Sequence, residues 1–171
     1  KTNYFEGENM SYLKKPISLL VISLLIVVIG SFIAYQFNSS NGDVDVSRIY
    51  FETERGELSG LLYKPDGADQ EAKPTLITTH GYLNSAEMQD AQAIEMSKRG
   101  YVVLALDQYD HGHSTGTMEK PVPFFSFWPH AIHDAVQYMY DQDYVLKDEE
   151  GNGIIAVSGH SMGGFSSTHA V

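Results

Sequence analysis

The chain has 171 residues, 43% of them hydrophobic and 12% aromatic, which is enough apolar surface for a packed core and excludes a wholly disordered polypeptide. Its formal net charge of −11 opposes binding to a phosphate backbone, so we expect no nucleic-acid partner. The sequence has no Cys, which excludes disulfides, thiolate metal ligands and Cys nucleophiles.

The N-terminal residues are expected to precede the folded part of the protein. The chain begins with Lys1, whereas the first Met is Met10, and the residues after Met10 are typical of a natural bacterial start. We therefore interpret residues 1–9 as translated upstream sequence and residues 1–16 as a cytoplasmic N-terminus.

A long apolar segment comes next, at residues 17–37, and it contains no charged side chain. A segment of this length crosses the hydrocarbon core of a membrane as a helix. Lys14 and Lys15 precede it and acidic residues follow it, so the positive-inside rule places the N-terminus in the cytoplasm. We predict a single-pass, uncleaved anchor in the lipid of a bacterial cell membrane, with the remaining chain outside. A cleaved signal peptide and a buried helix of a soluble protein are the alternatives.

The rest of the chain predicts a linker followed by one α/β domain. Residues 38–47 are polar and rich in turn formers, which favours a flexible linker, and residues 48–171 have a globular pattern. A hairpin followed by alternating strands and helices predicts a mostly parallel sheet covered by helices. The expected strands are Ile49–Thr53, Leu58–Tyr63, Thr75–Thr79, Tyr101–Leu106 and Ile154–Ser158, and the expected helices are Ser85–Lys98, Pro129–Tyr140 and one that begins at Met162.

The motif Gly-x-Ser-x-Gly occurs at residues 159–163, between the last expected strand and the last expected helix. A bare match arises by chance in about one chain in twenty of this length. The setting of strand, turn and helix is more specific, because a nucleophile on such a turn requires it. We therefore predict that Ser161 is a catalytic nucleophile, and an ordinary glycine-rich turn is the alternative.

The neighbours of Ser161 have a physical role in this prediction. A Ser at the tip of a tight, strained turn projects its Oγ from the carboxyl edge of the sheet. Gly159 and Gly163 are expected beside it, because a Cβ at either position would clash where strand and helix converge. Since the helix begins at once, the backbone N–H of Met162 is placed to bind an oxyanion.

The sequence Gly-His-Ser-Met-Gly-Gly at residues 159–164 resembles the nucleophile elbow of the α/β-hydrolase superfamily. It looks most like the branch of monoacylglycerol lipases and serine aminopeptidases (S33). The resemblance covers about residues 47–171 and implies an incomplete α/β-hydrolase fold that needs no cofactor.

Two further motifs carry this resemblance. His80-Gly81-Tyr82 resembles the family's His-Gly-x loop, which implies that the N–H of Tyr82 is the second oxyanion donor and that His80 organises the loop. Gly81 lets the backbone approach a reacting oxygen closely. A role for His80 as general base is the alternative.

The segment 107–114 resembles the family's Asp-x-x-Gly-x-Gly-x-Ser loop, which implies a structural role for Asp107 in one wall of the site. Asp110 stands where the family has Gly, and Asp tolerates unusual backbone angles better than most residues. Asp107, His111 and His113 also suggest a metal site in isolation, but their spacing does not fit one, and we predict no metal.

The resemblance implies acyl transfer, in which Ser161 forms an acyl-enzyme with the help of a His and an acid. In this family the acid and the His follow the Ser in the chain. His160 occupies the variable position of the motif and His169 lies only about two helical turns further on, so neither is expected to be the base. We therefore interpret the sequence as the N-terminal portion of a longer enzyme, nearly inactive by itself.

The favoured function is a membrane-tethered hydrolase of small carboxylic esters, similar to acylglycerol lipases and carboxylesterases. A peptidase or amidase, an acyltransferase and a non-catalytic binding module of the same fold are the alternatives. Two segments remain open to interpretation. Residues 121–129 are expected to form a loop packed on the core, with an acyl pocket or a membrane contact as alternatives, and residues 148–153 are expected to form a solvated turn.

Overall fold

The computed structural model describes residues 16–116 and 124–170, and the chain divides into two compact units at Asn38 and Ser39. The first unit contains helix α2 (Pro16–Asn38), 23 residues long, in which no residue is buried. This helix is long and apolar enough to cross a membrane. A signal sequence near the N-terminus can have the same length and composition.

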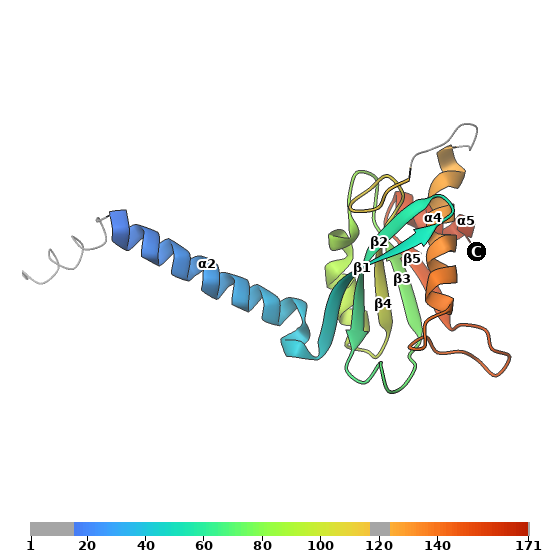
Figure 1. Cartoon of the computed structure of the whole chain (residues 1–171), viewed down its shortest axis with the longest axis horizontal. Helices are drawn as coiled ribbons and strands as arrows, with labels where there is room; N and C mark the ends of the chain where they lie inside the picture. Colours follow the sequence, from blue (N-terminus) through green and yellow to red (C-terminus); the bar gives the residue numbers. More distant parts are fainter. Residues whose placement is uncertain (1–15, 117–123, 171) are drawn as a thin grey trace, which may run out of the picture. The chain divides into compact units, whose positions relative to one another are not determined.

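The second unit contains a five-stranded sheet with strand order β1-β2-β4-β3-β5 (Figure 1). The first two strands form an antiparallel hairpin, β2 pairs antiparallel with β4, and β3 pairs parallel with both β4 and β5. The strands are β1 (Val44–Thr53), β2 (Gly56–Pro65), β3 (Thr75–Thr79), β4 (Val102–Asp107) and β5 (Ile155–Gly159). The predicted α/β class is therefore confirmed, and the sheet is mixed, with two antiparallel and two parallel pairings where a mostly parallel sheet was predicted.

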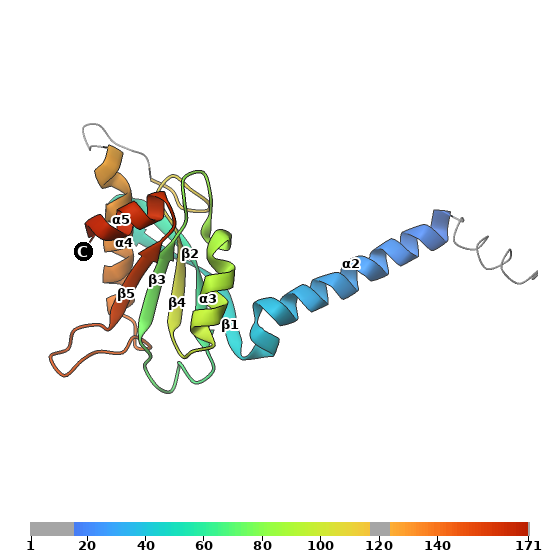
Figure 2. The ribbon, with the colours of Figure 1, turned by 180° about the vertical axis from the view of Figure 1, so that it is seen from behind.

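Helices cover both faces of the sheet, as Figures 1 and 2 show from opposite sides. The helical elements of this unit are η1 (Ser40–Gly42), η2 (Ala86–Gln89), α3 (Asp90–Ser97), α4 (Phe124–Tyr140) and α5 (Met162–Ala170). Alternate residues of β4 point to opposite faces, because side chains alternate along a strand. Leu104 and Leu106 belong to the larger core with Ile132 of α4, whereas Val103 belongs to the smaller core with Ile94 of α3. Burial on both faces explains why β4 is apolar from Val102 to Leu106.

Two expected boundaries are wrong. The sheet begins at Val44, which pairs with Pro65 and is only 2% exposed, so part of the expected linker 38–47 is strand. The polar residues around Val44 concealed this short alternating pattern. Helix α4 begins at Phe124, so the second half of segment 121–129 is helical and not a loop. Pro129 lies inside the helix, where burial of neighbouring aromatic side chains offsets the backbone hydrogen bond that a proline cannot donate. Residues 121–123 lie outside the described ranges.

The parallel strands bring three loops to one edge of the sheet. Because β3, β4 and β5 run in the same direction, their carboxyl ends meet at one edge. The segments that follow these strands begin at His80, Gln108 and His160, and they carry the three motifs singled out in the sequence. In α/β folds, ligands bind at this edge.

Candidate active site

Ser161 lies at the turn between β5 and α5, where the sequence predicts it. Its φ is +53°, in the left-handed region that a residue with a Cβ rarely adopts. The residue is exposed, and its carbonyl accepts a hydrogen bond of 3.0 Å from the N–H of Phe165 in the first turn of α5. The strained backbone of Ser161 therefore joins a strand to a helix with no intervening loop.

Gly159 and Gly163 allow this strand and this helix to converge. A Cβ on Gly159 would lie 2.3 Å from the carbonyl carbon of Gly163. A Cβ on Gly163 would lie 2.5 Å from the carbonyl oxygen of Thr79 and 2.6 Å from that of His80. Each of these contacts is with backbone atoms, which cannot move aside as a flexible side chain would. Any larger residue at either glycine must displace the turn or the end of β3.

The His80-Gly81-Tyr82 segment lies directly beside this turn. A Cβ on Gly81 would lie 3.4 Å from the Cβ of Ser161 and 3.3 Å from Cδ2 of His160. The backbone N–H groups of Tyr82 and Met162 donate to no acceptor among the described residues. These two groups, singled out from the sequence as oxyanion donors, therefore remain available to a ligand.

His80 is fully buried, and both of its ring nitrogens meet backbone groups. Nδ1 lies 2.7 Å from the carbonyl oxygen of Gly81, and Nε2 lies 3.1 Å from the N–H of Gln108. The first must donate and the second must accept, so the ring is the neutral Nδ1–H tautomer. Burial lowers its pKa, which favours the same neutral form. His80 thus joins the loop after β3 to the loop after β4.

The loop after β4 has the left-handed turns that its sequence requires. Asp110 has a φ of +61° and Gly112 a φ of +54°, so Asp110 adopts the conformation of the Gly that it replaces. A Cβ on Gly112 would lie 2.1 Å from Oδ1 of Asp107. The loop is therefore folded tightly around the Asp107 carboxylate.

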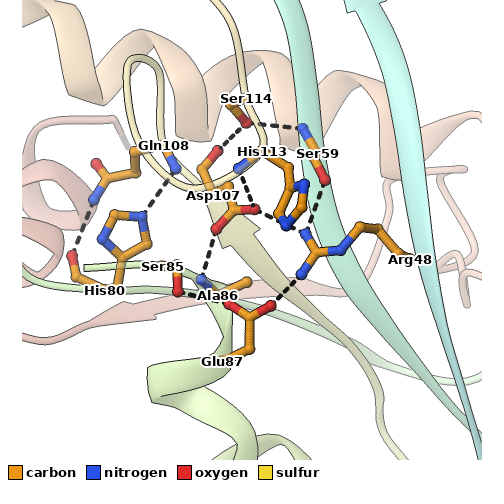
Figure 3. A network of polar contacts seen from close by, with 10 residues as sticks. All are labelled: Arg48, Ser59, His80, Ser85, Ala86, Glu87, Asp107, Gln108, His113 and Ser114. Atoms are coloured by element: carbon orange, nitrogen blue, oxygen red, sulfur yellow. Dashed lines mark hydrogen bonds and ion pairs between the residues drawn. The ribbon is translucent and has the colours of Figure 1, made fainter. Parts of the chain in front are cut away.

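Asp107 is the centre of a polar network that fixes these loops together (Figure 3). Its carboxylate is fully buried and accepts hydrogen bonds from the N–H of Ala86 at 2.6 Å and the N–H of His113 at 3.1 Å. Arg48 on β1 donates to the same carboxylate at 2.9 Å and also pairs with Glu87. The arginine is the partner that sequence reasoning missed, because it lies 59 residues away with no motif around it.

Comparison with known proteins gives the family. The family described as "Serine aminopeptidase, S33" matches residues 70–171, which is more than half of the chain. The chain belongs to this family. A search of the curated proteins found no match.

Solved structures of α/β-hydrolases match this S33-family chain over its second unit. Est1E from Butyrivibrio proteoclasticus, solved with ferulic acid bound, is 27% identical with a TM-score of 0.58, and the match covers 71% of this chain and 46% of that protein. The α/β-hydrolase GrgF from Penicillium sp. sh18 is 22% identical with a TM-score of 0.61, and the match covers 74% of this chain and 41% of that protein. The esterase Pf2001 of Pyrococcus furiosus is 24% identical with a TM-score of 0.58, and the match covers 77% of this chain and 48% of that protein.

The chain thus spans less than half the length of these hydrolases. Together the family and the fold establish it as an α/β-hydrolase with esterase-like relatives. This agrees with the resemblance drawn from its motifs.

Two other polar residues considered in the sequence, His169 and Asp148, have local partners in the S33-family domain. His169 is exposed, and its Nδ1 lies 2.9 Å from the carbonyl oxygen of Phe165, one helical turn earlier. Asp148 accepts hydrogen bonds from the N–H groups of Glu150 and Asn152, as in a solvated turn. Within residues 16–116 and 124–170, no three His, Asp or Glu side chains are grouped to hold a metal ion.

Proposed function

We propose that this protein is a serine hydrolase that cleaves carboxylic esters through an acyl-enzyme on Ser161. The observation that supports this most directly is the φ of +53° at an exposed Ser between β5 and α5. Such strain persists only where the surrounding structure enforces it, and it is concentrated at functional sites. An ordinary glycine-rich turn would place a glycine in this conformation and would avoid the strain.

The oxyanion of the tetrahedral intermediate would be bound by the N–H groups of Tyr82 and Met162. Neither donates to another group within the described residues, and a Cβ added to Gly81 would lie 3.4 Å from the Cβ of Ser161. Met162 also begins α5, whose positive end favours a developing negative charge. Loss of one such donor typically costs about 2.7–4 kcal/mol of transition-state stabilisation.

His80 would act as an organiser of the oxyanion loop and not as the general base. Both of its nitrogens are engaged by backbone groups, which leaves neither free to accept a proton from Ser161. In the described part of the chain, Ser161 Oγ has no hydrogen bond to any His. We therefore propose that a base and an acid from outside residues 1–171 complete the triad, consistent with the greater length of the related hydrolases.

Ester hydrolysis is favoured over peptide hydrolysis because a similar solved structure, Pf2001 of Pyrococcus furiosus, is described as an esterase. Est1E, which is 27% identical over the aligned residues, was solved with ferulic acid, a carboxylic acid of the kind that either reaction releases. The description of the family keeps aminopeptidase activity as the second candidate. Both reactions use the same elbow, so residues of the substrate pocket decide between them. A non-catalytic module is disfavoured, because it gains nothing from the strained turn.

We also propose that α2 is an uncleaved anchor with the hydrolase domain outside a bacterial cell. None of its residues is buried within its own unit, and its 23 residues suffice to cross the hydrocarbon core. The protein should stay with membranes through carbonate extraction at high pH. A variant with Leu24 and Val27 replaced by Arg should be released, and equal release of both would contradict the anchor. N-terminal sequencing of the mature protein distinguishes an anchor from a cleaved signal.

A serine-directed fluorophosphonate probe tests the nucleophile. We expect the probe to label Ser161 in a longer protein that contains this chain and the proposed base and acid. It should label the 171-residue chain far more slowly. The variant Ser161→Ala should lose labelling and ester turnover by at least about a thousandfold, whereas Ser47→Ala on β1 should keep both. Labelling of Ser161→Ala at the wild-type rate would refute the assignment.

A further inference from the structure

The loop after β4 contains a buried imidazole with one unpaired nitrogen. His111 is only 8% exposed, and its Nδ1 lies 3.0 Å from the carbonyl oxygen of Tyr109. A carbonyl oxygen only accepts, so Nδ1 carries the proton and Nε2 of the neutral ring is an acceptor. No donor among the described residues reaches Nε2. Since an unpaired buried acceptor costs about 1–3 kcal/mol, a group that donates to this atom would be bound favourably.

A second unpaired acceptor belongs to the same loop. Gln108 is fully buried, and its Nε2 donates to the carbonyl oxygen of His80 at 3.0 Å. That bond fixes the orientation of the amide, so Oε1 is the free end, and the described residues offer it no donor. The rings of His80 and His111 are 5.2 Å apart, so both acceptors belong to residues that contact His80. Because both atoms are acceptors, the group that they lack is a donor, and a carboxylate would be repelled.

Aromatic rings surround His111. The ring centroids of Tyr82 and Trp128 lie 5.6 Å and 5.9 Å from that of His111, and 5.9 Å from each other. Trp128 is buried, but Tyr82 is 61% exposed. Tyr82 also follows Gly81, where an added Cβ would lie 3.4 Å from the Cβ of Ser161. The aromatic group around His111 therefore includes the residue next to the one that faces the proposed nucleophile.

We propose that His111 Nε2 and Gln108 Oε1 form a subsite that accepts a hydrogen bond from a substrate hydroxyl, while Tyr82 packs against the carbon skeleton of the substrate. The substrate class is thus an ester whose acyl group carries a hydroxyl. This proposal rests on the proposed function, because it takes Ser161 as the position of the reacting carbonyl. A site built to bind a hydroxyl discriminates strongly against the analogue without it, since the buried polar groups are then left unpaired.

The experiment compares matched esters on the full-length protein. The series consists of butyrate esters with a hydroxyl, an amino group or only hydrogen at the second, third or fourth carbon. We expect kcat/KM for the best hydroxy ester to exceed that of plain butyrate by about tenfold or more. In His111→Phe this ratio should fall to about one. In His111→Gln, whose amide oxygen still accepts, part of the preference should remain.

Two outcomes would overturn the subsite. One is equal kcat/KM for hydroxy and plain esters in the wild type, which is expected if buried water satisfies both acceptors. The other is an unchanged ratio in folded His111→Phe. A preference for the amino esters would overturn the assignment to a hydroxyl. Fluorophosphonate labelling of Ser161 is measured in every variant, so failure of the nucleophile is distinguished from failure of the subsite, and His111→Gln remains informative if His111→Phe does not fold.

Discussion

The backbone N–H of His160 donates a hydrogen bond of 3.0 Å to the carbonyl oxygen of Thr79. This bond joins the first residue of the nucleophile turn to the last residue of β3. The side-chain hydroxyl of Thr79 also donates to the carbonyl oxygen of Ser158, at 3.3 Å. The position of the turn therefore depends on the end of the neighbouring strand as much as on its own sequence.

Gly163→Ala should damage the turn, because its Cβ would lie 2.5 Å from the carbonyl oxygen of Thr79. We expect a loss of about 3 kcal/mol in the free energy of unfolding and slower fluorophosphonate labelling of Ser161. Gly164→Ala is the matched control on the same helix, since the nearest atom to its Cβ is 3.0 Å away. Urea denaturation measures the free energy of unfolding of both variants. Equal stability of the two variants would contradict the close packing described here.

Asp107→Asn should destabilise the loops of the site. The three groups that contact the carboxylate are all donors, so an amide NH2 in place of one oxygen would face a donor. The change also removes the buried charge partner of Arg48. Breaking a buried ion pair costs about 3–5 kcal/mol. Glu87→Gln removes the other, half-exposed partner of Arg48 and should cost no more than about 1 kcal/mol. Thermal and urea unfolding of both variants would show whether the buried partner dominates.

The lowered pKa of His80 predicts a specific pH dependence of stability. The ring has a pKa below its usual value of 6.5, so the unfolded state binds a proton more readily than the folded state. The contribution of His80 to the free energy of unfolding is fully present above the pKa of the unfolded state. It is lost as the pH falls from about 6.5 through the pKa of the folded state.

Wild type should therefore lose more unfolding free energy between about pH 7.5 and pH 5.5 than His80→Gln does. Urea denaturation at both pH values measures the unfolding free energy of the two proteins. An identical slope for His80→Gln and wild type would show that His80 is protonated equally in both states.

Asp110 offers a test of the turn after β4. Its φ of +61° suits Gly, and Asp110→Gly should raise the unfolding free energy by up to about 1 kcal/mol. Asp110→Ala should lower it by a similar amount, because alanine pays the steric cost without the polar side chain of Asp. The opposite signs of the two effects are measured by chemical denaturation, and a stabilising alanine would be incompatible with this backbone conformation.

Sequence reasoning predicted the sharp turn at Ser161 because a short, local pattern specifies it. The turn at Ser161, the left-handed Asp110 and the buried β4 all follow from residues within a few positions of each other. The partnership of Arg48 with Asp107 and the grouping of Tyr82, His111 and Trp128 depend on tertiary packing between distant segments, for which local patterns carry no signal. The start of α4 was missed because Pro129 normally interrupts a helix, and here the buried Phe127 and Trp128 outweigh that tendency.

Strand β5 pairs only with β3 among the described strands, so its other edge presents unpaired backbone amides and carbonyls. The strand that leads into the turn at Ser161 is thus also an open template for edge-to-edge self-association. In concentrated solution, we expect copies of the 171-residue chain to aggregate through this edge, beside the hydroxyl of the proposed nucleophile. Whatever polypeptide shields the edge therefore protects solubility and access to the serine at the same time.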